Sequence, residues 1–125
     1  MTTVSKERNV FHVNQPIQSG MDLMQWRRHI GISRPVYALL SACSERTLAT
    51  EEARRRLQLH KARKLNETYR LLIGLCGIMD PANVGKWLNE PNKWFAGKTP
   101  LDVIRSGQID QVWTMIHHTR EGGYA

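Results

Sequence analysis

The stretch SRPVYALLSACSERTLAT, residues 33–50, predicts two short helices joined by a tight turn. Ser33 is followed by Pro35, and this order is typical of a helix start, because a serine side chain caps unpaired backbone N–H groups and proline fits the first turn. Ser44 precedes the second apolar segment and predicts a second start of the same kind. This stretch is therefore predicted to form two consecutive helices.

Small and apolar residues in this stretch occupy the places that a helix-turn-helix requires. Ala38 lies where the two helices would cross, and Ala42 lies where the turn would begin, so both places hold a small residue. Cys43 follows as the apolar turn residue, and Leu48 is placed to pack back onto the first helix. The spacing therefore predicts a helix-turn-helix.

The second helix of this motif would leave polar side chains exposed to a partner. In a helix-turn-helix, the first residues of the second helix can enter the major groove of DNA. Arg46 is suited to guanine and Glu45 to a cytosine amine, whereas Thr47 and the arginines that follow are suited to phosphates. The candidate DNA-binding residues are Ser33, Arg34, Ser44, Glu45, Arg46, Thr47, Ala49, Thr50, Arg54 and Arg55.

The charge of the chain is concentrated in its first part. Of 125 residues, 18 are Lys or Arg and 11 are Asp or Glu, which gives a net charge of +7. Residues 1–70 hold 13 of these cations and 6 of the acids, so this part carries the whole excess. Such asymmetry favours a polyanionic partner such as DNA. The alternative is a basic helix face kept for solubility, and Glu45, Glu51 and Glu52 would oppose binding to DNA.

The remaining sequence predicts an all-α protein, a small helical bundle of about seven helices, with no convincing strand pattern. Residues 1–19 are expected to form a mobile arm, with a weak strand signal at Val10–Val13. A helix with an apolar face of Met21, Met24, Trp26 and Ile30 is expected next. Acidic residues at 51 and 52 suggest that a long helix begins there and runs to Cys76. Later helices are expected after Asp80 and Thr99 and from Ile109.

Enzyme and membrane functions find no support in the sequence. His117 and His118 are adjacent and would point apart on a helix, and no Cys/His set has the spacing of metal ligands, so we expect no catalytic residues, metal or cofactor. Cys43 and Cys76 fit no redox motif, and no apolar stretch reaches the length of a membrane span. We expect a reduced, cytoplasmic protein.

A dense motif follows in residues 84–107, with VGKWLNEPN at 84–92 and FAGKTPLDVI at 95–104. It resembles the toxin-binding domain of Xre/MbcA/ParS-type bacterial antitoxins, although Phe95-Ala96 stands where the family often has leucine. The resemblance extends over residues 20–123 and includes the helix-turn-helix upstream. The matching motif residues are Trp87, Leu88, Pro91, Asn92, Phe95, Gly97, Pro100, Leu101 and Gly107.

Beyond the arm (1–19), which the resemblance does not cover, the resemblance implies two regions: an Xre-like DNA-binding region (20–64) and a toxin-binding domain (65–125). It implies a RES-class toxin partner that degrades NAD or transfers ADP-ribose, whose active site the antitoxin occludes. It also implies a repressor, expected to be a dimer, that binds operator DNA. The motif residues Trp87, Leu88 and Phe95 are expected to form core. Candidate toxin-binding residues are Trp94, Lys98, Trp113, His117, Arg120, Gly122, Gly123, Tyr124 and Ala125.

Two other functions remain open at this point. One is a plain transcriptional regulator whose C-terminal part forms a dimer and meets no toxin. The other is an interaction adaptor whose helix-turn-helix has lost DNA binding.

Overall fold

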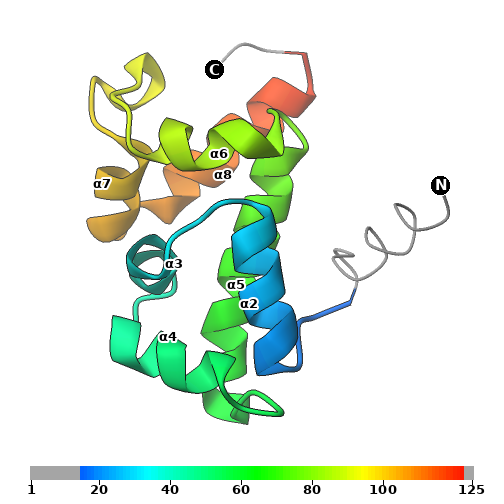
Figure 1. Cartoon of the computed structure of the whole chain (residues 1–125). Coiled ribbons are helices and arrows are strands. Elements are labelled where there is room, and N and C mark those ends of the chain that lie inside the picture. Colours follow the sequence, from blue (N-terminus) through cyan, green and yellow to red (C-terminus); the bar gives the residue numbers. More distant parts are fainter. Residues whose placement is uncertain (1–14, 123–125) are drawn as a thin grey trace, which may run out of the picture. The chain divides into compact units, whose positions relative to one another are not determined.

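The computed structural model describes residues 15–122, and all regular structure in this range is helical (Figure 1). The predicted all-α fold is confirmed. The described residues fall into two compact units that divide between Arg70 and Leu71, inside one helix. The helices are α2 (Gly20–His29), α3 (Arg34–Leu40), α4 (Glu45–Glu52), α5 (Leu59–Cys76), α6 (Pro81–Leu88), α7 (Pro100–Arg105) and α8 (Ile109–Arg120), with a 3-10 turn, η1 (Lys93–Phe95).

The predicted helix starts are confirmed by side-chain caps. Ser33 caps α3 and Ser44 caps α4, each accepting a hydrogen bond from a backbone N–H three residues later. Asp80 caps α6 by accepting from the N–H of Ala82, and Thr99 caps α7 by accepting from the N–H of Asp102; a proline occupies the first turn of both helices. These starts are local events, so the sequence alone predicts them well.

The predicted long helix from residue 51 to Cys76 is wrong at its beginning. α4 continues through Glu52, and α5 starts only at Leu59. The acids at 51 and 52 do not begin a helix, because both side chains turn into the interior, where Glu51 accepts a hydrogen bond from the backbone N–H of Gln58 (3.0 Å). Ala53, expected on the buried stripe, is exposed in the intervening loop.

The core of the first unit lies between α2, α3, α4 and the beginning of α5. α4 packs against both α2 and α3. The Tyr37 hydroxyl donates to the carbonyl oxygen of Leu65 (3.0 Å), which fixes α3 to α5. Met21, expected on the apolar face of its helix, is 60% exposed. The largest buried side chains of this unit are Leu23, Trp26, Tyr37, Leu48, Leu65 and Tyr69.

The last residues of the expected arm are bound to the first unit. Ile17 is buried, and its backbone N–H and carbonyl both bond to the Asn66 amide, at 2.6 and 2.9 Å. The backbone N–H of Leu57 donates to Gln18 (2.8 Å). Residues 15–19 are therefore part of the fold, because an apolar residue and a paired amide hold them. Residues 1–14, with the strand signal at Val10–Val13, lie outside the described residues.

The second unit is built on α6, α7 and α8, with α7 packed against both of the others. Gly74 on α5 gives room to the ring of Trp113, since an added Cβ would lie 3.3 Å from that ring. No helix between residues 15 and 122 is long and apolar enough to cross a membrane. The buried side chains of this unit include Leu75, Val84, Leu88, Phe95, Val103, Val112, Met115 and Ile116.

Candidate functional site

The first unit contains a helix-turn-helix formed by α3, residues 41–44 and α4. Ala38 is buried where the helices cross, and the N–H of Cys43 donates to its carbonyl oxygen (3.0 Å). Ala42 begins the turn with φ +56°, a left-handed conformation that is open to few side chains other than glycine. Leu48 is completely buried. The local geometry agrees with the spacing from which the motif was predicted.

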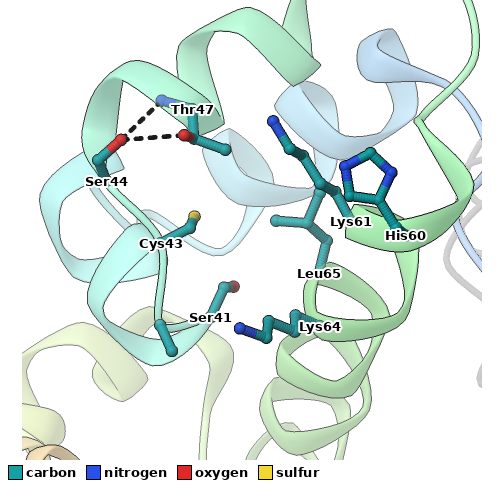
Figure 2. Close-up of a pocket in the computed structure, with 9 residues that line it drawn as sticks. Ser41, Cys43, Ser44, Thr47, His60, Lys61, Lys64 and Leu65 are labelled. Atoms are coloured by element: carbon teal, nitrogen blue, oxygen red, sulfur yellow. Dashed lines mark hydrogen bonds between the residues drawn. The ribbon is translucent and has the colours of Figure 1, made fainter.

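The outer face of α4 carries the polar side chains expected on a reading helix. Glu45, Arg46 and Thr50 are exposed, whereas Thr47 and Ala49 are half-buried. The Ser44 hydroxyl accepts the Thr47 N–H (3.0 Å) and bonds to the Thr47 hydroxyl (3.0 Å), which fixes the first turn of α4 (Figure 2). Arg46 makes no ion pair with any described residue and remains available to a partner.

A buried ion-pair cluster holds the helix-turn-helix to α2. Glu52, at the end of α4, receives Arg27 from α2 at 2.6 Å and Arg34 from α3 at 2.8 Å. Arg27 also donates to the carbonyl oxygen of Ile32 (3.1 Å). Burial raises the pKa of Glu52, but the hydrogen bonds and charges of the two arginines together lower it by more. The pKa of Glu52 is therefore below its ordinary value. Arg34, a candidate phosphate contact, is thus already engaged at the base of the motif.

Two of the three acidic residues that were expected to oppose DNA binding, Glu51 and Glu52, are buried. Glu51 is completely buried and Glu52 is 6% exposed, with its charge balanced by two guanidinium groups. Of the three carboxylates, only Glu45 faces solvent on α4. The expected repulsion toward a polyanion is therefore smaller than the sequence suggested.

The loop after α4 presents consecutive basic residues. Arg54, Arg55 and Arg56 are all exposed. Arg54 donates to the carbonyl oxygen of Arg56 (3.2 Å) and lies 3.9 Å from a carboxylate oxygen of Glu51. These arginines carry the charge that suits phosphate contacts, and Ser33, which caps α3 and is also exposed, offers a neutral hydroxyl.

The motif residues of the second unit mainly shape the fold. Leu88 and Phe95 are buried as predicted, but Trp87 is only half-buried and packs edge-on against Phe95. Asn92 organises the turn, since its side chain caps η1 at Trp94 (2.8 Å) and its carbonyl oxygen accepts from Phe95 and Gly97. Pro91 is exposed beside this turn, and Gly97 has φ +86°. Pro100 and Leu101 are buried at the start of α7.

Two tryptophan–histidine pairs lie on the surface of the second unit. Trp113 stacks on His117 with ring centroids 6.0 Å apart, and both belong to α8. Trp94 from η1 meets His118 at 5.0 Å. Both indoles are half-buried and both imidazoles exposed. Sequence reasoning missed His118, because its partner comes from a distant turn.

The other candidate toxin-binding residues are placed only in part. Lys98 and Arg120 are exposed, and the Arg120 guanidinium lies over Gly77. Gly122 ends the last turn with φ +97°. Gly123, Tyr124 and Ala125 lie outside the described residues.

No group of three potential metal ligands occurs among residues 15–122. The two cysteines are unpaired and half-buried. Burial raises the pKa of the Cys43 thiol, and burial together with Asp80 raises the pKa of Cys76 to about 11. Both thiols are therefore poor nucleophiles near neutral pH.

Comparisons with known proteins address the second unit directly. Residues 79–122 match the family model of the antitoxin Xre/MbcA/ParS C-terminal toxin-binding domain. No curated protein sequence matches the chain. Among solved structures, a chain of the crystal structure of the M. tuberculosis MbcT–MbcA toxin–antitoxin complex is similar, with a TM-score of 0.64 and 17% identity, covering 85% of this chain and 96% of that one. At this identity the structural likeness establishes the fold.

The matched segment contains the whole of α6, η1, α7 and α8 and all the motif residues from Trp87 to Gly107. The resemblance drawn from the sequence is thereby confirmed: the C-terminal part of this chain is similar to the toxin-binding domain of Xre/MbcA/ParS antitoxins.

Proposed function

We propose that the chain is the antitoxin of a type II toxin–antitoxin pair, and that it acts by binding rather than by catalysis. The observation that carries this proposal is the match of residues 79–122 to an antitoxin toxin-binding domain. The partner is a RES-class toxin that consumes NAD or transfers ADP-ribose, and the second unit covers the entrance to its active site. Both proteins would meet in the cytoplasm.

The surface features of the second unit support a protein partner. Half-buried tryptophans with adjoining polar groups are typical of binding hot spots. Trp94 and Trp113 fit this description, and Lys98, His117 and Arg120 supply exposed polar groups on the same unit. The segment Gly122–Ala125 adds the aromatic side chain of Tyr124, which suits insertion into a nucleotide pocket.

Co-expression with the product of the adjacent gene tests the antitoxin role. Cells that express the adjacent product alone should stop growing, and cells that also express this chain should grow. Purified toxin should lose its NAD-consuming activity when the chain is added in equimolar amount. If growth is not restored while DNA binding persists, the chain is a plain regulator and the antitoxin proposal is wrong.

We further propose that the first unit binds operator DNA as part of a dimer, because one reading helix contacts too few base pairs alone. Three features support this: the helix-turn-helix, the exposed Arg46 on α4, and the basic loop at residues 54–56. The inward position of Glu51 and Glu52 removes two opposing charges from the proposed contact surface.

A salt titration tests the DNA contact. Binding of the full chain to the DNA upstream of its gene should weaken about a thousandfold between about 50 and 200 mM salt if six or so phosphates are contacted. Fluorescence anisotropy measures this directly, with a scrambled duplex of equal length as the control. Absent binding at the lowest salt would identify an adaptor that has lost the DNA function.

A further inference from the structure

A cavity of about 340 Å³ lies in the first unit, between the turn that joins α3 to α4 and the beginning of α5 (Figure 2). The turn contributes Cys43 and Ser44, α4 contributes Thr47, and α5 contributes His60, Lys61 and Lys64. None of the residues that line the cavity is acidic. Its volume falls within the range of about 300–1,000 Å³ that small-molecule sites occupy.

Two cations line the cavity, and none of its lining residues is acidic. Lys61 and Lys64 form no ion pair with any described residue, although nearby Arg63 on the same helix pairs with Glu67 (3.5 Å). Figure 2 shows both lysine side chains extending from α5 toward the α3–α4 turn. Burial raises the pKa of the Cys43 thiol, with a smaller contribution from the Glu51 carboxylate, and this outweighs the lowering by the two ammonium groups, so the thiol stays protonated and does not neutralise them.

Hydrogen-bonding groups and apolar walls complete the lining. The hydroxyls of Ser44 and Thr47 meet at 3.0 Å at the beginning of α4, where backbone N–H groups favour anions. Leu65, Cys43 and the lysine stems provide apolar surface on the other sides. A phosphate contact to DNA would need only exposed cations, whereas an apolar-walled cavity of this size suits an anion with an organic part.

We propose that this cavity binds a small phosphate-bearing organic molecule of about mononucleotide size, with Lys61 and Lys64 holding the phosphate and the Thr47 hydroxyl donating a hydrogen bond. The proposal does not depend on the antitoxin function. If the first unit also binds DNA, the bound molecule would lie directly beside the reading helix, because Ser44 and Thr47 belong to both surfaces.

The test is a titration of the ¹⁵N-labelled full chain with adenosine 5′-monophosphate, followed by NMR at constant ionic strength. Saturable shifts confined to residues 41–47 and 60–65 are expected. Adenosine, which lacks the phosphate, should produce none of these shifts. Lys61→Gln and Lys64→Gln should each weaken binding about tenfold, since each removes one charge-assisted hydrogen bond.

The matched control is Arg63→Gln, which removes an exposed cation of the same helix that does not line the cavity and should leave binding unchanged. Thermal unfolding checks that each variant is folded. Four results would overturn the proposal: no saturable shift, equal shifts with adenosine, unchanged binding in both lysine variants, or shifts in this region with random duplex DNA but none with the nucleotide.

Discussion

One turn in each unit contains an alanine in the strained left-handed conformation. Ala42 and Ala96 both have φ +56°, and each follows a short helical segment. An L-residue in this conformation costs about 1–2 kcal/mol relative to the right-handed one. Neither side chain is buried, so nothing in packing requires alanine rather than glycine at these positions.

Ala42→Gly is expected to raise the free energy of unfolding by up to about 1 kcal/mol, because the strain disappears and only part of the gain is lost to backbone entropy. Urea unfolding followed by circular dichroism measures the change. Ala49→Gly is the matched control, since the same substitution inside α4 should lower stability by about 1 kcal/mol. A loss of stability in Ala42→Gly would contradict the left-handed geometry of the turn.

Glu52 is a buried carboxylate that pairs with two arginines of the first unit. Glu52→Gln leaves Arg27 buried beside a neutral group and should lower the free energy of unfolding by about 3 kcal/mol. The folded-state pKa of Glu52 lies below its ordinary value of 4.5, so its contribution is present above pH 4.5 and is lost as the pH falls through the folded-state pKa.

Urea unfolding of wild type and Glu52→Gln across pH 3–7 checks both statements. The difference between the two proteins should be constant near neutrality and should shrink below pH 4.5. Glu67→Gln serves as the control, because its exposed pair with Arg63 should contribute less than about 0.5 kcal/mol. An undiminished difference at the lowest pH would show that the Glu52 charge does not stabilise the unit.

At the scale of elements, close contact between helices depends on Gly20. This first residue of α2 donates its N–H to the carbonyl oxygen of Arg54 (3.0 Å), just beyond the end of α4. An added Cβ would lie 2.5 Å from the carbonyl oxygens of Glu52 and Arg54, and closer still to that of Glu51. These are backbone atoms, so they cannot move aside as a flexible side chain would.

Gly20→Ala should therefore destabilise the first unit by about 3 kcal/mol, the upper part of the usual range for overpacking. Thermal unfolding measures the loss. Met21→Ala, at the exposed neighbouring position of the same helix, should change stability little. If Gly20→Ala unfolds at the wild-type temperature, α2 and the end of α4 are not in contact as described.

Helix caps could be predicted from the sequence, whereas features that depend on contacts between helices could not. Caps at Ser33, Ser44, Asp80 and Thr99 depend on neighbours in the chain, and all four were predicted. The break between α4 and α5 was missed, because Glu51 and Glu52 are acceptable first-turn residues until their partners on other helices are known. Likewise Lys61 and Lys64 appear as ordinary solvated cations in sequence, and only packing of α5 against the α3–α4 turn places them in a cavity.

At the scale of the whole molecule, the proposed functions belong to different units, so they should be separable. Arg46→Ala is expected to weaken operator binding by about 1–3 kcal/mol and to leave toxin neutralisation unchanged. Removal of Gly122–Ala125 should impair neutralisation and spare DNA binding. Anisotropy and growth rescue measure the two activities in parallel. Loss of both activities in either variant would contradict the division.

The amide of Asn66 joins both backbone groups of Ile17, a residue 49 positions earlier. During synthesis the nascent chain therefore has to emerge from the ribosome at least as far as Asn66 before Ile17 can form these two hydrogen bonds. Until then Trp26 and Tyr37 have no α5 to pack against, and the half-made product exposes apolar side chains to chaperones and proteases.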